Sequence, residues 1–161
     1  MNRKEYNIAI DEYSERVFRY AFRWTKDEAL AKDIVQETFE KLWKNRKKVD
    51  HEKAKSWVFT VAHRLLINES RKRKTEHSDD FKFADATLGG SRYELKDLID
   101  VALNTLPNLQ RSILLLRDSE GYNYKEIGVI LNLSESQVKV YLFRARKKIK
   151  TYLKDLSVLV V

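Results

Sequence analysis

Scarcity of glycine and proline is the feature that most limits the folds open to this chain. Only four glycines and one proline occur in 161 residues, whereas an all-β fold needs many residues that suit tight turns. Apolar residues make up 43 % of the sequence, which is enough to form a real core, so global disorder is not expected. We therefore predict an all-α fold.

Composition also excludes several classes of function. The chain has no cysteine, which removes disulfides, thiolate zinc sites and cysteine nucleophiles together. No apolar run approaches the ~20 residues that span a bilayer, and the N-terminal residues lack the apolar stretch of a signal peptide. We expect no membrane insertion and a cytoplasmic location. The sequence has no P-loop, GxSxG or HExxH motif, so we expect neither catalysis nor a cofactor.

The distribution of charge says more about partners than the net charge of +8. Two dense basic stretches stand out: residues 71–74 are all Arg or Lys, and residues 139–150 contain six basic side chains and no acidic one. Residues 94–126, by contrast, hold six acids and four bases. Two basic concentrations on separate segments indicate a polyanionic partner. Solvated helix faces would produce a similar pattern, so charge alone leaves that alternative open.

The middle of the chain divides it into two parts. Residues 77–92 break every helical pattern and contain the pair Gly89-Gly90, and structureless stretches of this length are more common between domains than inside one. Fully extended, they would reach roughly 55 Å. We predict two small helical domains, 8–76 and 93–156, joined by a flexible linker at 77–92.

The C-terminal part contains a helix-turn-helix pattern. Asn123 with Glu126 and Ser134 with Gln137 each form a capping box, and the two boxes are eleven residues apart. Between them, Asn132 suits a left-handed turn. A small residue where the helices cross and apolar residues under the second helix complete the pattern. A plain helical hairpin with a basic end is the alternative interpretation.

In the second helix of this pattern, Val138, Leu142, Ala145 and Ile149 form an inward stripe at helical spacing. A recognition helix enters the major groove of DNA by its N-terminal turns. Glutamine there can pair with adenine, lysine can reach guanine, and valine can contact a thymine methyl group. The residues predicted to contact DNA are Ser136, Gln137, Lys139, Val140, Arg144 and Lys148.

Five segments of the sequence together indicate a family. They are AKDIVQETFEKLW (31–43), SWVFTVAH (56–63), LPNLQR (106–111), EGYNYKEIG (120–128), and QVK with LFRAR (137–146). In their order and spacing they resemble the bacterial RNA polymerase sigma factors of the extracytoplasmic-function (ECF) type, a group of the sigma-70 family, over nearly the whole chain. The resemblance implies a factor that brings core polymerase to specific promoters, reads their −10 and −35 elements and aids their opening. It also implies domain roles: 8–76 as sigma region 2 and 93–156 as sigma region 4.

The implied partners are core RNA polymerase, promoter DNA and an anti-sigma protein. The second helix would dock on the clamp coiled coil of the polymerase β′ subunit, and region 4 on the β flap. The residues at the matching positions are Asp33, Gln36, Glu37 and Phe39, with Glu40 a further candidate. The polar members lie three or four residues apart and so share one helix face.

The third helix and its preceding loop would read the −10 element. In the family, a loop residue near this segment captures a flipped base, and the usual residue at the position of Arg64 is Asn. Trp57 and Phe59 lie where stacking on unpaired bases is conceivable, although Trp57 is in phase with core positions. The residues assigned to −10 contact are His63, Arg64, Asn68, Arg71, Lys72 and Arg73.

Two other classes of protein remain to be weighed. A stand-alone helix-turn-helix regulator would share the C-terminal pattern, and a nonspecific basic adaptor would share the charge. Neither explains the acidic strip of the second helix. A footprint that is confined to promoter DNA and requires core polymerase would separate the three.

Overall fold

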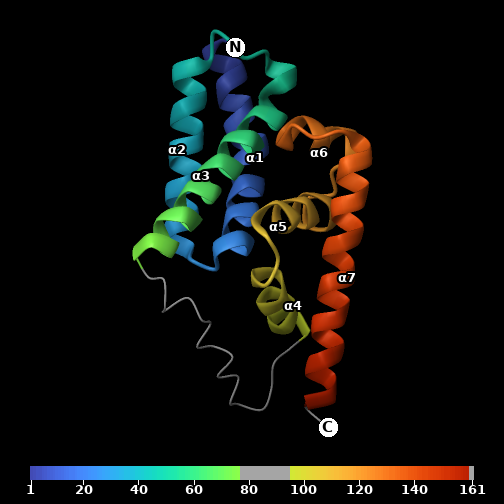
Figure 1. Cartoon of the computed structure of the whole chain (residues 1–161). Helices are drawn as coiled ribbons and strands as arrows, with labels where there is room; N and C mark the ends of the chain where they lie inside the picture. The colour runs from blue at the N-terminus through green and yellow to red at the C-terminus, as the bar shows by residue number, and fades with distance from the viewer. Residues whose placement is uncertain (77–94, 160–161) are drawn as a thin grey trace.

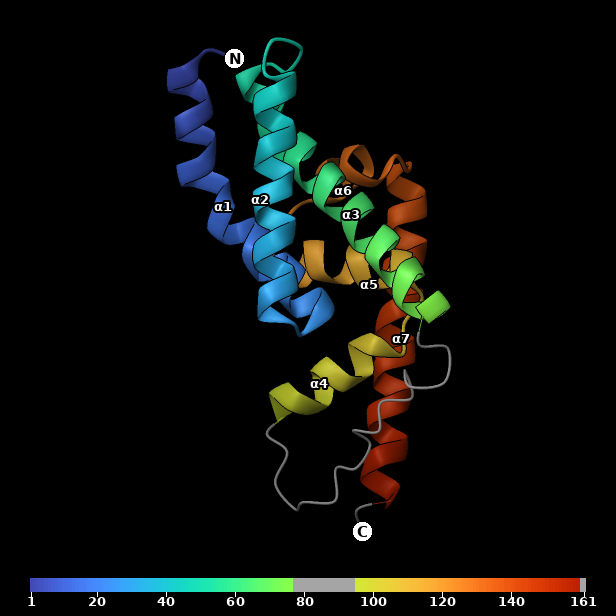
Figure 2. The same cartoon turned by 90° about the vertical axis from the view of Figure 1, so that its left-hand side faces the viewer.

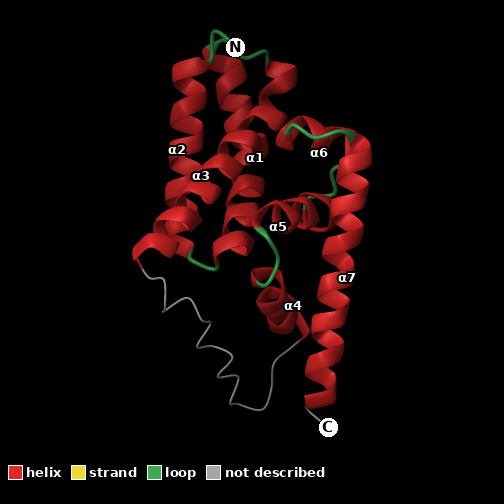
Figure 3. Ribbon diagram, viewed as in Figure 1, coloured by secondary structure: helices red, strands yellow, loops and turns green. Residues whose placement is uncertain are grey.

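The computed structural model describes residues 1–76 and 95–159, and all regular structure in these residues is helical (Figures 1 and 3). The all-α prediction is confirmed. None of the helices in these two ranges is both long and apolar enough to cross a membrane. An N-terminal unit contains α1 (Arg3–Thr25), α2 (Glu28–Asn45), the 3₁₀ turn η1 (His51–Lys53) and α3 (Ala54–Glu76). A C-terminal unit contains α4 (Leu95–Asn104), α5 (Asn108–Leu114), the π-helical turn η3 (Leu115–Ser119), α6 (Tyr124–Leu131) and α7 (Glu135–Leu159).

Local signals set the ends of the helices in the N-terminal unit. Lys26 adopts a left-handed conformation with φ 57° and ends α1. The side chain of Asp27 then accepts the backbone N–H of Leu30 and starts α2. Val17, Tyr20 and Trp24 lie three or four residues apart on α1 and are buried, so α1, α2 and α3 pack into a bundle around that face (Figure 2).

One feature expected in this unit is wrong. The resemblance placed a loop around His63 and Arg64, but α3 runs without interruption from Ala54 to Glu76. The reason is local: no glycine or proline interrupts α3, and Val58, Ala62 and Leu66 are fully buried at successive helical turns. The loop that precedes α3 therefore consists of residues 46–53, and Arg64 lies on the helix itself.

The helix-turn-helix forms as the sequence predicts. Asn123 and Glu126 make both bonds of the capping box of α6, and Asn132 ends that helix with φ 56°. Ser134 and Gln137 also bond reciprocally, at 3.1 and 2.9 Å. The predicted inward stripe of α7 is buried at Val138, Leu142 and Ala145, with 0 %, 2 % and 0 % exposure, and Ile149 is partly buried against the same core.

Gly128→Ala is expected to destabilise the C-terminal unit, although alanine is the better helix former by about 1 kcal/mol. A Cβ at Gly128 would lie 2.5 Å from the backbone carbonyl oxygen of Leu133, which belongs to the turn between α6 and α7. We expect a loss of about 1–3 kcal/mol of unfolding free energy, measured by urea denaturation. Val129→Ala, at an exposed position beside it, is the control. A stability equal to wild type would contradict the close helix crossing.

The two units pack directly against each other. The predicted linker at 77–92 lies outside the described residues, but α4, α5 and α6 lie between the N-terminal unit and α7 (Figure 1), and buried side chains of both units form one hydrophobic core. Tyr122 is 3 % exposed, and its ring meets Phe59 of α3 edge to face at 5.1 Å. We call this packing the closed arrangement.

Candidate nucleic-acid interface

The side chains that the sequence assigns to DNA contact lie on the exposed side of α7. Their exposed orientation follows from the burial of the opposite stripe, which leaves the remaining positions of the helix facing solvent. The structure brings together on this side Ser136, Gln137, Lys139, Val140, Arg144 and Lys148.

Two of these side chains are held by neighbours. The Gln137 side-chain oxygen accepts the Ser134 backbone N–H at 2.9 Å, so pairing to adenine through both amide atoms would require this capping bond to break. The Lys139 ammonium lies 5.6 Å from the centre of the Tyr124 ring. The cap and the ring thus restrict where the two side chains can point at the start of the recognition helix.

Phe143 is a candidate contact that sequence reasoning did not assign. Its side chain is 68 % exposed, and it follows Ser136 and Val140 at intervals of seven and three residues on one face of α7. Phenylalanine can make an apolar contact with a thymine methyl group. The sequence already contained this signal, because a large aromatic side chain at a solvent-facing position of a helix is unusual.

The basic end of α3 divides into two sets. Arg64, Asn68, Arg71 and Lys72 are exposed. Arg73 instead pairs with Asp27 at 2.9 Å, and this bond helps to lower the pKa of the Asp27 carboxyl, after the backbone N–H of Leu30. The remaining assigned residue, His63, faces the C-terminal unit.

The acidic strip on α2 is exposed. Asp33, Gln36, Glu37 and Glu40 face solvent and line a shallow groove of about 330 Å³ together with two lysines. Phe39 is only 6 % exposed and faces the bundle core, so it serves the packing of α2, and its contact with polymerase stays a prediction. Asp33 makes no ion pair within the described residues, whereas Glu37 lies 4.0 Å from Lys41.

The acidic strip and the basic end of α3 share a second groove. It has a volume of about 470 Å³ and lies between α2 and α3. Asp33 and Glu37 line one side, and Asn68, Arg71 and Lys72 line the other. The residues assigned to polymerase and those assigned to the −10 element are therefore neighbours, which a linear reading does not reveal.

A buried polar cluster joins the two units at Ser112. Its hydroxyl accepts the Tyr20 O–H at 2.9 Å and the Trp24 indole N–H at 3.0 Å. Because both acceptor sites are then used, its own proton goes to Nδ1 of His63, 2.7 Å away. The closed arrangement therefore needs a neutral His63 with an unprotonated Nδ1.

Acidification below pH 6.5 is expected to weaken the closed arrangement. Burial, and secondarily the charge of Arg64, lowers the pKa of His63 from 6.5 to about 4. A separated unit with an ordinary histidine binds a proton as the pH falls through 6.5, while the closed form resists protonation until about pH 4. At pH 5 the closed form should lose about 2 kcal/mol relative to pH 7.5. Urea denaturation at each pH measures this, and His63→Gln should flatten the profile between pH 5 and 7. A parallel decline in the variant would contradict the assignment.

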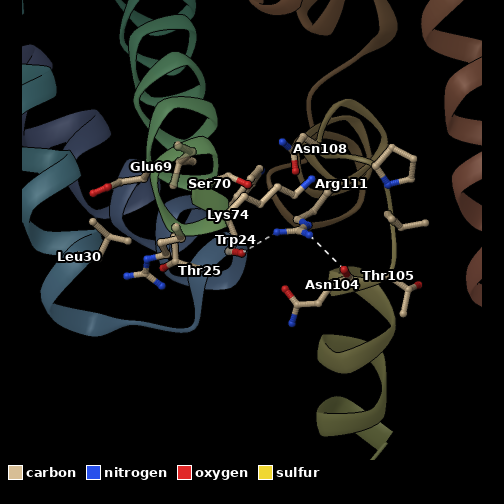
Figure 4. Close-up of a pocket in the computed structure, with 14 residues that line it drawn as sticks. Trp24, Thr25, Leu30, Glu69, Ser70, Lys74, Asn104, Thr105, Asn108 and Arg111 are labelled. Carbon is tan, nitrogen blue, oxygen red and sulfur yellow. Dashed lines mark hydrogen bonds between the residues drawn. The ribbon is translucent and has the colours of Figure 1, made fainter. Parts of the chain in front are cut away.

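Arg111 forms a second link between the units (Figure 4). Its guanidinium donates to the backbone carbonyls of Trp24, Leu103 and Asn104 at 3.3, 3.1 and 3.2 Å and lies 4.3 Å from the centre of the Trp24 ring. Burial lowers its pKa to about 10, so it remains charged at neutral pH. Beside it, a cavity of about 580 Å³ opens between α3 and the turn from α4 to α5.

Comparison with known proteins identifies the family. The family model for sigma-70 region 2 matches residues 9–76, and that for sigma-70 region 4 matches residues 96–149. The ECF RNA polymerase sigma factor SigM of Bacillus subtilis is 37 % identical over 153 residues, which cover 89 % of this chain and 94 % of SigM. SigW of the same organism is 27 % identical over an alignment of 165 positions, which covers 91 % of this chain and 88 % of SigW.

Two solved structures share the fold. The sigma factor RpoE from Bartonella quintana, in complex with the anti-sigma factor NepR, has a TM-score of 0.74 and 23 % identity, and the match covers 94 % of this chain and 98 % of RpoE. CnrH, in complex with the cytosolic domain of CnrY, has a TM-score of 0.75 and 19 % identity, and the match covers 96 % of this chain and 90 % of CnrH.

The chain belongs to the ECF sigma factors of the sigma-70 family. It is a promoter-specific transcription initiation factor. A stand-alone helix-turn-helix regulator is not favoured, because the N-terminal unit matches sigma region 2.

Proposed function

We propose that this chain binds core RNA polymerase through α2 and reads the two promoter elements with its two units. The N-terminal domain, 8–76, would contact the −10 element through residues 46–53 and the exposed face of α3. The C-terminal domain, 93–156, would contact the −35 element through α7. The same domain would also bind the polymerase β flap. One observation carries the proposal: the acidic strip and the recognition helix are both exposed, each on a separate unit.

An anti-sigma protein is the further partner that we propose. Support comes from RpoE and CnrH, which have this fold and were solved with NepR and with the cytosolic domain of CnrY. Action on RNA polymerase would place the chain in the cytoplasm. We assign it no catalytic role, since its contribution would be binding and positioning.

Substitutions on α7 should separate base reading from phosphate binding. Gln137→Ala or Lys139→Ala should change preference within the −35 element, since each lost base contact is worth ~1–3 kcal/mol. Lys148→Ala should weaken binding about equally on all sequences and reduce the salt slope by about 1. Run-off transcription with core polymerase on a library of promoter sequences measures both effects.

A matched comparison decides the outcome. Lys154→Ala, further along α7, should leave promoter preference unchanged. If Gln137→Ala, Lys139→Ala and Lys148→Ala all weaken binding equally on every sequence, α7 docks on phosphates without reading bases. No promoter-directed transcript from the wild-type chain would overturn the proposed function.

A further inference from the structure

Ion pairs between the two units all have the same polarity in the part of the chain that the structure describes. Arg19 forms a two-point pair with Glu120, at 2.7 and 2.9 Å. Lys26 bonds Asp100, with Arg23 3.8 Å from the same carboxylate. In each case the cation comes from the N-terminal unit and the carboxylate from the C-terminal unit, and the same holds for Lys55 with Glu126.

The cations on α1 form a continuous stripe. Arg16, Arg19, Arg23 and Lys26 follow one another at intervals of three, four and three residues, which places them on one side of the helix. The stripe is about 15 Å long at a rise of ~1.5 Å per residue. Lys55 of α3 extends this surface toward Phe59. We call these five cations the α1 basic face.

An aromatic ring of the C-terminal unit, Tyr122, is buried beside this face at 3 % exposure, and we call the surface that it covers the recess. The Tyr122 ring has Arg16 5.8 Å and Lys55 5.0 Å from its centre, and it contacts Phe59 edge to face. Glu120 and Glu126 lie two residues before and four residues after Tyr122 in the sequence. The C-terminal unit thus presents an aromatic ring with flanking carboxylates to a recess with flanking cations.

This combination is the chemistry of a nucleotide. A nucleobase offers a flat aromatic face and its phosphates offer negative charge, and proteins hold single strands with cationic grooves and aromatic platforms. When the units separate, Tyr122 and its neighbouring carboxylates leave together. The N-terminal unit then exposes the recess and the buried parts of these five cations, of which Arg19 and Lys26 are partly exposed in the closed arrangement.

We propose that the α1 basic face is a binding surface for single-stranded DNA, which the acidic, aromatic face of the C-terminal unit masks in the closed arrangement. The recess selects an unpaired base, because the bases of a duplex are stacked within the duplex and cannot enter the recess. This inference rests on the proposed function, which supplies an opened promoter strand, and it adds a site away from the exposed face of α3.

The test compares masked and unmasked forms of the full chain. Glu120→Gln with Tyr122→Ala removes one bidentate ion pair and the inserted ring without changing the α1 basic face. Since the chain has no cysteine, dyes on cysteines at the exposed positions Lys47 and Lys150 report separation of the units by energy transfer. Fluorescence anisotropy measures binding to an oligothymidylate of about 20 nucleotides at several salt concentrations.

Unmasking should tighten binding to the oligothymidylate about tenfold. Adding Arg16→Gln and Arg19→Gln should remove this gain and lower the salt slope by about 1.4, or ~0.7 for each phosphate contact on a single strand. Lys4→Gln with Lys32→Gln changes the net charge equally at exposed positions off this face and should preserve the gain. An abasic strand of the same length should bind more weakly than the oligothymidylate.

Three results would overturn the inference. In the first, energy transfer shows that the units of the unmasked variant have separated, but the variant binds the oligothymidylate no tighter than wild type does. The second is a gain that survives Arg16→Gln with Arg19→Gln. The third is equal binding of abasic DNA or of polyglutamate, which would mean that the surface takes any polyanion. If these occur while the wild-type chain still supports promoter-directed transcription, only this inference fails and the proposed function stands.

Discussion

Cross-linking position 55 to position 126 is expected to abolish promoter-directed transcription, and cleaving the cross-link is expected to restore it. Lys55 and Glu126 pair across the closed arrangement, and each side chain is about a third exposed. In a chain without cysteine, Lys55→Cys with Glu126→Cys provides two unique thiols for a short bis-maleimide whose spacer contains a disulfide. Run-off transcription before and after reduction is the measurement.

Distance along the promoter is the reason for this expectation. The −10 and −35 elements are centred about 25 base pairs apart, or roughly 85 Å along a duplex that rises ~3.4 Å per pair. In the closed arrangement α3 packs directly against α6, so α3 and α7 cannot reach both elements at once. If residues 77–92 form the predicted linker, their extended reach of roughly 55 Å, added to the dimensions of the two units, would make the separated state long enough.

Each single-cysteine variant, treated with the same reagent, controls for modification alone and should remain active. Full transcription by the cross-linked chain would show that the two units can stay together on a promoter. That result would contradict the expected separation of the units. It would not affect the proposed DNA contacts of α3 and α7, which have separate tests.

Asp33→Lys with Glu37→Lys is expected to abolish assembly with core polymerase. The two carboxylates lie on the exposed strip of α2, and Asp33 has no ion-pair partner among the described residues, so it is available to a basic partner. Reversing both charges replaces attraction with repulsion, and like charges brought together at an interface cost several kcal/mol. Co-elution with core polymerase on a sizing column measures the loss.

Helix content by circular dichroism should remain at the wild-type level, because both side chains face solvent. Asp11→Lys with Glu15→Lys reverses the same number of charges at exposed positions of α1 and should still co-elute. If the α2 variant binds core polymerase as well as wild type does, the docking surface lies elsewhere.

Short-range signals in the sequence predicted the helices and the recognition motif correctly. Asn132 at the turn, the two capping boxes, and the stripe of Val138, Leu142 and Ala145 depend on residues within a few positions of one another. Such signals work because a helix end or a buried face is set by hydrogen bonds and spacing within one or two turns. The exposed faces of α2 and α7 follow from the same periodicity.

The roles of other residues depended on contacts between distant segments. His63 was assigned to DNA, but Ser112, 49 residues away, binds its ring. Arg73 pairs with Asp27, 46 residues away, and Tyr122 fills a recess formed by α1 and α3. Periodicity specifies which side of a helix faces the core, but it does not specify which distant surface covers the other side. Only the packing of the two units decided that the basic side of α1 is covered by acidic and aromatic residues, because that match requires side chains some hundred positions apart to meet.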